Sequence, residues 1–279
     1  MTPSRQEASS HPGVSPQDYP EYYDDISGRP CLACGREDFR PDREIDRYGF
    51  RFGFTRCDCG LIRQEPMPNQ GFFEWFFNSE IFFSAREEGS DEIWGFYDYF
   101  KDEPSRLATS RRRYRLLAAL LEPERPLRIM KIGPSTGTFL HVAQEHGHDV
   151  LGCDVSSRFV EYAKENYNVR IDHGRFERLG YDDDSFDVVL FLNVIENVPN
   201  QEEFWDAVSR TVAPGGTVVL NIVEMEGNLL ARFQGDRYFM YRPPICYMFT
   251  ESAMRRVLDR FGFDILEIWR DVRYMHAEK

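Results

Sequence analysis

The strongest constraint on the fold is a short apolar segment that ends in a glycine-bearing turn and leads into a helix. Residues 127–137 read LRIMKIGPSTG, and a helix is predicted to follow directly. A strand, a Gly-rich turn and a helix N-terminus bring backbone N–H groups close to a ligand. A second predicted strand ends in Asp154, and an acid at that place typically accepts hydrogen bonds from ribose hydroxyls. The segment therefore predicts a nucleoside-binding βαβ unit.

The region around this unit alternates predicted strands and helices. Strands are predicted at 127–133, 149–154, 169–172, 186–192 and 217–223, and helices at 137–147, 157–166, 201–212 and 250–262. Residues 213–216, APGG, predict a sharp turn before the fifth strand, and a further strand is predicted at 263–272. Alternation of this kind predicts an α/β fold with a Rossmann-like, doubly wound, mainly parallel sheet that binds its ligand at the carboxyl ends of the strands.

Four cysteines precede this region in two close pairs. The pairs read CLACG and CDCG, with 22 residues between them, and consist of Cys31, Cys34, Cys57 and Cys59. Paired cysteines at this spacing suit a tetrahedral Zn(Cys)4 site. The alternatives are reduced structural cysteines or disulfides, and a cytoplasmic setting disfavours disulfides. Because four thiolates leave no open coordination position, this zinc would be structural and would stabilise a lobe that is too small for a large core of its own.

The charge of the chain limits its partners. The formal net charge is −13, without a dense basic patch, which argues against general binding to nucleic acid or to an anionic membrane. No run of apolar residues approaches the length of a membrane span, and the polar N-terminus lacks the apolar segment of a signal peptide. We therefore expect a cytoplasmic protein with no membrane partner.

Between residues 127 and 223 the chain resembles the class I S-adenosylmethionine (SAM)-dependent methyltransferases. The matching pieces are IGPSTGTFL, GCDVSSRFVEYAKE, DSFDVVLFLNVIENV and VAPGGTVVLNI, in the order and spacing of that family. Cysteine pairs ahead of such a domain are similar to those of bacterial methyltransferases with an N-terminal zinc ribbon, which are often encoded with sugar or natural-product pathways. The resemblance implies SAM-dependent methyl transfer to a sugar-type or natural-product small molecule.

The resemblance assigns the cofactor to the turn and to the acid that follows the second strand. Asp154 would hold the ribose hydroxyls of SAM, and Val155 would flank the adenine. The amino-acid part of SAM would be cradled by Gly133, Pro134, Ser135, Thr136 and Gly137. A simpler interpretation of Asp154 is an acid that caps the next helix before Ser156 and Ser157.

Two further pairs of residues complete the implied site. Arg175 and Phe176 lie in the segment where the family contacts adenine, although the usual Asp of the family is Arg175 here. Asn193 and Val194, at the end of the fourth strand, would line the methyl-transfer site.

Two residues of the first motif depart from the family. An acid two positions before the first glycine normally helps to hold the SAM ammonium, often through water, and this chain has Lys131 at that position. A cation that faces a ligand with an ammonium and a sulfonium is unfavourable unless it is screened, deprotonated or turned toward the carboxylate. The central glycine of the turn is Ser135, a milder change.

The sequence names no clear general base. The Glu-His pair that the family carries after the fourth strand reads Glu196-Asn197, and the pair that sugar C-methyltransferases carry before the late helix is replaced within RPPI at 242–245. The candidates are His173, Glu196 and Tyr241. Methyl transfer can need little acid–base help, because the sulfonium is a strong methyl donor and positioning supplies much of the rate.

We expect four parts in the chain. They are a disordered tail at 1–28, a zinc-ribbon lobe at 29–66, a helical linker or lid at 67–122 and a methyltransferase domain at 123–279. Residues 71–100 are dense in aromatic side chains and predict short helices. These aromatics form either a packing seam between lobe and main domain or a lid that stacks on a ring-bearing substrate.

Two other functions remain open at this point. Lys131 favours a methyltransferase-fold protein that does not methylate, because it uses SAM unusually, runs another reaction in the same pocket or acts as a non-catalytic partner. An RNA methyltransferase that uses the zinc ribbon as its RNA-binding module is the third possibility, and the net charge of −13 argues against it.

Overall fold

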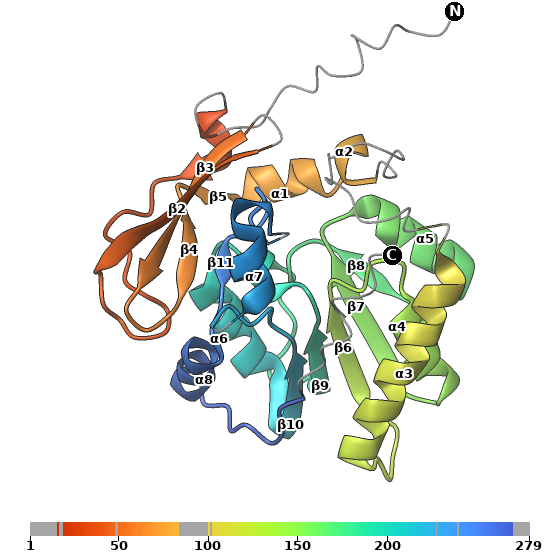
Figure 1. The fold of residues 1–279 in the computed structure, drawn as a ribbon. Coiled ribbons are helices and arrows are strands. Elements are labelled where there is room, and N and C mark those ends of the chain that lie inside the picture. Colours follow the sequence, from red (N-terminus) through yellow and green to blue (C-terminus); the bar gives the residue numbers. More distant parts are fainter. Residues whose placement is uncertain are drawn as a thin grey trace, which may run out of the picture.

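The computed structural model of the chain describes residues 16, 19–47, 50–83, 100, 102–226, 228–238 and 240–269. The first part of the expected tail and residues 84–99 of the expected lid lie outside the described residues. A five-stranded sheet, a four-stranded sheet and a two-stranded ribbon organise the rest (Figure 1).

The five-stranded sheet is parallel throughout and has the strand order β10-β9-β6-β7-β8. Its strands are β6 (Arg128–Ile132), β7 (Asp149–Asp154), β8 (Ile171–His173), β9 (Phe186–Phe191) and β10 (Val212–Leu220). Because the chain goes outward from β6 to β8 and then returns to β9 on the other side, the strand order reverses between β6 and β9. This confirms the expected Rossmann-like, doubly wound sheet, a fold that generally binds its ligands at the carboxyl ends of the strands where the order reverses.

Helices cover both faces of this sheet (Figure 1). One face carries α3 (Glu103–Leu121), α4 (Thr138–Glu145) and α5 (Ser157–Tyr167), and the other carries α6 (Gln201–Thr211) and α8 (Glu251–Arg260). On the first face Tyr114 and Phe139 pack with Ile129 in one buried cluster. On the second face the ring of Trp205 lies 5.5 Å from that of Phe191. Each large side chain buried in this way contributes about 1.5–3 kcal/mol to folding.

Two expected features concern the far edge of the sheet. The APGG segment at 213–216 falls within the bounds of β10, but its residues have no partner on β9, Gly215 has a φ of +75°, and continuous pairing begins only at Thr217, so the chain does bend there ahead of the regular strand. The strand predicted at 263–272 is wrong for the described residues 263–269, which are irregular. Its alternating pattern does not suffice, because Leu266 and Trp269 remain exposed and no sheet edge pairs with the segment.

The region expected as a zinc-ribbon lobe, residues 29–66, is called the cysteine lobe below. It is built on an antiparallel sheet with the order β11-β4-β3-β2. Its strands are β2 (Phe39–Arg47), β3 (Phe50–Cys57), β4 (Ile62–Glu65) and β11 (Tyr247–Met248). The last of these comes from the region that follows β10, and Tyr247 pairs with Arg63 while Met248 pairs with Ile62. One strand of the C-terminal region therefore completes the sheet of the N-terminal lobe.

The residues from Tyr19 onward are ordered, although they fall within the expected disordered tail. They form η1 (Pro20–Tyr22) and β1 (Tyr23–Asp24), and β1 pairs with β5 (Met67–Pro68). The reason is aromatic packing: Tyr22 stacks on Trp75 with 5.9 Å between ring centroids, and Tyr23 lies 5.7 Å from Phe72.

Short helices lie over the carboxyl ends of the parallel strands (Figure 1). They are α1 (Gln70–Phe76) and α2 (Glu80–Phe83), as expected for the aromatic segment, together with α7 (Leu229–Gln234) and η4 (Gly235–Arg237). Two single turns, η2 (Phe176–Arg178) and η3 (Ile195–Asn197), follow β8 and β9. No helix in the described part of the chain is long and apolar enough to cross a membrane.

Candidate functional site

The turn between β6 and α4 has the tight backbone that the sequence predicts. The backbone angle φ is +61° at Gly133, +49° at Ser135 and +81° at Gly137. A Cβ atom on Gly133 would lie 2.7 Å from a methyl carbon of Val194, so only glycine fits there. Ser135 holds a left-handed conformation where the family has glycine, which costs about 1–2 kcal/mol. The turn is thus a strained segment that β6 and α4 hold in place.

Asp154 at the end of β7 ties the turn to the neighbouring strand. Its Oδ2 accepts a hydrogen bond from the backbone N–H of Ser135 at 3.1 Å, and its Oδ1 accepts one from Ser156 at 2.9 Å. Burial raises the pKa of Asp154 to about 6, although these two hydrogen bonds oppose the shift. Ser156 is the N-cap residue of α5, so this hydrogen bond precedes the first turn of the helix, and both the capping and the ribose-binding interpretations of Asp154 stay predictions.

Lys131 lies on β6 directly below the turn, and its side chain is only 4% exposed. Its Nζ donates to the carbonyl oxygens of Ile132 at 3.2 Å and Gly133 at 3.4 Å. Burial and the nearby guanidinium of Arg113 lower the pKa of Lys131 to about 7, and Asp154 opposes this shift. The amine is therefore held at the first residue of the turn.

Two buried hydroxyls beside the turn have no hydrogen-bond partner among the described residues. They are Oγ1 of Thr136, in the turn itself, and Oγ of Ser156, which follows Asp154. Buried polar atoms are normally satisfied, so orphaned hydroxyls at this place fit a site that receives a polar ligand. The residues present thus fit the ribose and amino-acid parts of SAM.

The aromatic segment is fastened to the expected adenine side of the site. Asn78, just after α1, donates from Nδ2 to the carbonyl of Val155 at 3.1 Å. Its Oδ1 accepts from the backbone N–H of Ser157 at 3.0 Å. His173 is exposed, and its Nε2 lies 3.1 Å from the same Val155 oxygen. Asn78 was not foreseen from the sequence, because its partners lie about eighty positions further along the chain.

The two other residues expected at the adenine differ in their surroundings. Arg175 donates from Nη1 to Oε1 of Gln70 at 2.7 Å, which adds a second link between α1 and the main domain. Phe176 is buried, and its ring lies 5.6 Å from that of Tyr181 and 6.2 Å from that of Phe204. Phe176 is therefore a core residue in this structure, and an adenine-facing role for it stays a prediction.

The ends of β9 and β10 lie on the other side of the turn from β7. The backbone N–H of Asn193 donates to Oδ1 of Asn221 at 2.7 Å, and Nδ2 of Asn221 donates back to Oδ1 of Asn193 at 2.7 Å. Val194 follows and lies against Gly133, as its close approach to that glycine shows. This pair joins the strand end to the turn, and Asn221 is a partner that the sequence did not indicate.

Glu196 lies in η3, three residues after Asn193, and is buried. Its Oε1 accepts from the backbone N–H of Val223 at 3.3 Å, and its main-chain oxygen accepts from that of Cys246 at 2.7 Å. Burial raises the pKa of Glu196 to about 7. Oδ1 of Asn197, the next residue, is buried without a partner among the described residues. A carboxyl with this environment can exchange a proton near neutral pH.

The three candidate bases do not share one environment. Tyr241 packs into the cysteine lobe: its ring lies 5.5 Å from that of Phe54, and the Arg43 guanidinium sits over it at 5.0 Å. His173 contacts the carbonyl oxygen of Val155, and Glu196 lies in η3, the single turn that follows β9. Aromatic packing therefore accounts for Tyr241.

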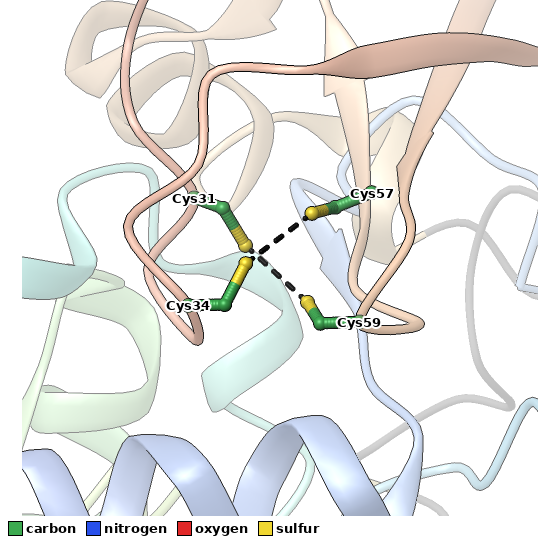
Figure 2. A group of neighbouring side chains, drawn as sticks. All are labelled: Cys31, Cys34, Cys57 and Cys59. Atoms are coloured by element: carbon green, nitrogen blue, oxygen red, sulfur yellow. Dashed lines mark hydrogen bonds between the residues drawn. The ribbon is translucent and has the colours of Figure 1, made fainter.

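The side chains of the four cysteines point toward one another (Figure 2). Sγ of Cys31 lies 3.5 Å from that of Cys59, Sγ of Cys34 lies 3.4 Å from that of Cys57, and all four sulfurs lie within 4.8 Å of one another. A zinc ion with bonds of about 2.3 Å in a tetrahedron requires sulfurs about 3.8 Å apart. The hydrogen bond from Cys31 lowers the pKa of Cys59 to about 5. The cluster can hold a tetrahedral metal ion.

Fold and site together define a class of protein. A parallel sheet in the order β10-β9-β6-β7-β8, with a glycine-bearing turn after β6 and an acid at the end of β7, is the fold of class I SAM-dependent methyltransferases. The comparison with known families agrees, because a model described as a methyltransferase domain matches residues 99–268, more than half of the chain. The chain belongs to this family.

Individual relatives are distant. A ubiquinone biosynthesis O-methyltransferase of Sinorhizobium medicae is 29% identical over 129 residues, which cover 44% of this chain and 52% of the relative. Norajmaline N-methyltransferase of Rauvolfia serpentina is 31% identical over 105 residues, 35% of this chain and 36% of the relative. A solved SAM-dependent methyltransferase of Mesorhizobium loti has a TM-score of 0.44 at 22% identity and covers 55% of this chain and 82% of its own. The chain thus spans about half the length of these curated relatives, or less.

Proposed function

We propose that this protein transfers a methyl group from SAM to a small molecule. The observation that carries the proposal is the turn at 133–137, which is tied to Asp154 and flanked by the orphaned hydroxyls of Thr136 and Ser156, in a chain of the methyltransferase-domain family. When bound there, SAM would supply an activated methyl group on its sulfonium. The chain would bind and orient this donor, which is the larger part of the catalytic task.

Each part of the cofactor has residues to hold it in this proposal. The backbone of the turn at 133–137 would surround the amino-acid part. Asp154 would accept hydrogen bonds from the ribose hydroxyls, either in addition to the one from Ser135 or in its place. The Val155 side, fastened by Asn78, would border the adenine.

The acceptor would lie at the ends of β9 and β10, beside Asn193 and Val194. We propose a sugar-type or natural-product intermediate, supported by the matched relatives, which are named for ubiquinone biosynthesis and for norajmaline. Glu196 is the base we propose for an acceptor hydroxyl or amine, because it is buried and its pKa is raised to about 7.

We further propose that Cys31, Cys34, Cys57 and Cys59 hold one structural zinc ion. The sulfur distances, the closed set of four thiols and the glycine after each pair support this metal. The four expected parts of the chain, and its cytoplasmic location, stay predictions, with the qualification that β11 joins the sheet of the cysteine lobe.

The test is a calorimetric titration with SAM and S-adenosylhomocysteine. We expect micromolar binding by the wild type and at least tenfold weaker binding by Asp154→Ala. Asp149→Ala is the matched control, because Asp149 is an exposed acid at the opposite end of the same strand. Labelled SAM with a panel of small hydroxyl and amine compounds would then identify the acceptor.

The alternative is a methyltransferase-fold protein that does not methylate, and Lys131 is the observation that favours it. No SAM binding by the wild type, with binding gained in Lys131→Asp, would establish this alternative. Binding without turnover on any acceptor class would leave a role as a non-catalytic partner.

A further inference from the structure

The most unusual charge in the site is the buried amine of Lys131. It occupies the position where methyltransferases of this kind carry an acid, and it is hydrogen-bonded to the carbonyl oxygens of Ile132 and Gly133. Both carbonyl oxygens are therefore already engaged by a donor, and Gly133 is the first residue of the turn. In its protonated form the amine repels a ligand ammonium at the turn, and it occupies two carbonyl acceptors there in either form.

Two further donors act on the same turn. The helix α4 begins at Thr138 directly after Gly137, and its N-terminus has no side-chain cap. Its first N–H groups and its dipole therefore favour an anion at the turn. The hydroxyl of Thr136 is buried, 1% exposed, and has no partner in the described part of the chain, so it is available to donate to a ligand.

SAM carries an ammonium and a carboxylate on its amino-acid part. Hydrogen-bond donors and a protonated amine attract the carboxylate and disfavour the ammonium. We propose that Lys131, the N-terminus of α4 and the Thr136 hydroxyl form a carboxylate-binding end of the cofactor site, so that this chain selects its cofactor by the carboxylate and tolerates loss of the ammonium. This inference rests on the proposed function, because it assigns a specificity-determining residue within the same SAM site.

The charged groups around Lys131 determine whether its amine is protonated when a ligand binds. Asp154 is close enough to favour its protonated form, whereas Arg113 on α3 opposes it, together with burial. A carboxylate at the turn would add a second favourable charge next to the amine and keep it protonated. Binding of a carboxylate ligand at pH 8 would then be accompanied by uptake of a proton.

The experiment compares three ligands that differ in which charged groups their amino-acid part carries. They are S-adenosylhomocysteine, its deamino analogue, which keeps the carboxylate, and its decarboxylated analogue, which keeps the ammonium. Each is titrated into the wild type, Lys131→Met and Lys131→Glu by calorimetry at pH 8 in two buffers of different ionisation enthalpy. Lys131→Met keeps an unbranched buried side chain and removes the charge together with the hydrogen bonds to Ile132 and Gly133.

We expect the wild type to bind the deamino analogue within about threefold of S-adenosylhomocysteine and the decarboxylated analogue at least about tenfold more weakly, as a charge-assisted hydrogen bond would give. Lys131→Met should lose most of this difference and the proton uptake, and Lys131→Glu should reverse the preference. A wild type that requires the ammonium, or an unchanged preference in Lys131→Met, would overturn the inference alone. A wild type that binds none of the three compounds would overturn the proposed function as well.

Discussion

Asn78 and Ser157 are joined by a hydrogen bond of 3.0 Å from the backbone N–H of Ser157 to the side-chain oxygen of Asn78. The same amide donates to the carbonyl of Val155, so both of its polar atoms bind the turn that follows Asp154. The aromatic segment that begins at α1 is therefore attached to the cofactor side of the main domain. The seam interpretation is supported for this part of the segment, which also packs on α5 through Phe82 and Phe159.

Asn78→Ala should weaken binding of S-adenosylhomocysteine by about tenfold, because two hydrogen bonds that fix the turn are lost. Asn78→Asp keeps the acceptor for Ser157 and loses the donor to Val155, so its affinity should lie between those of Asn78→Ala and the wild type. Calorimetric titration measures both. Asn166→Ala is the control, since Asn166 donates to a carbonyl on the exposed side of α5. Equal affinities for all four proteins would contradict this role for Asn78.

Glu196 should give the methyl-transfer rate its dependence on pH. Its pKa is raised to about 7, so the carboxylate that accepts a proton forms only as the pH rises through this value. The rate should therefore increase from pH 6 to pH 8 and then level off. Glu196→Gln should lower kcat by about 100-fold or more and remove this rise.

The control for Glu196→Gln is Glu202→Gln, which changes an exposed glutamate that pairs with Arg260. It should keep both the rate and the pH profile. If Glu196→Gln retains the wild-type kcat and profile, then Glu196 is only a structural carboxyl and positioning alone supplies the rate.

Features that depend on neighbouring residues could be predicted from the sequence, whereas contacts between segments far apart in the chain could not. The strand at 149–154 and the helix that follows it were predicted within one residue, because periodicity and the turn at 133–137 are local signals. The pairing of β11 with β4 and the attachment of Asn78 to Val155 had no such signal, since each depends on segments far apart in the sequence. The absent strand at 263–269 has the same cause, because alternation does not create a partner edge.

The cysteine cluster should bind one zinc ion per chain, and removal of that ion should disturb Glu196. Two backbone hydrogen bonds connect the cysteine-bearing sheet to this residue. The N–H of Gln64 on β4 donates to the carbonyl of Cys246 at 2.8 Å, and the N–H of Cys246 donates to the carbonyl of Glu196 at 2.7 Å. Cys57→Ser should lose the zinc, lower Tm by several degrees and reduce methyl transfer more than SAM binding. Cys153→Ala, a buried cysteine outside the cluster, should keep its zinc. Metal analysis and thermal unfolding test both, and a zinc-free wild type of normal stability would disprove the metal site.

Two glycines of the cysteine lobe form a matched pair that tests its contact with α8. A Cβ atom on Gly60 would lie 2.7 Å from Oγ1 of Thr250, the residue that caps α8, whereas one on Gly35 would meet nothing within 4 Å. Both glycines have positive φ, +73° at Gly35 and +94° at Gly60, so alanine strains the backbone at both positions, by at least about 1 kcal/mol. Gly60→Ala should therefore destabilise the protein by about 1–2 kcal/mol more than Gly35→Ala in urea unfolding. Equal losses would show that the lobe and α8 move apart freely.

Lys131 should also set how stability changes with pH. Its pKa is about 7 in the folded protein and near 10.5 when the amine is in water, so between these values the unfolded chain holds a proton that the folded chain has lost. Stability must then rise with pH over this interval, and the contribution is lost as the pH falls through 7. Lys131→Met has no such proton and removes a buried cation. It should be more stable than the wild type by about 1–3 kcal/mol at pH 6, with the difference shrinking toward pH 10. Urea unfolding at several pH values measures this, and a difference independent of pH would mean that Lys131 keeps its charge in the folded protein.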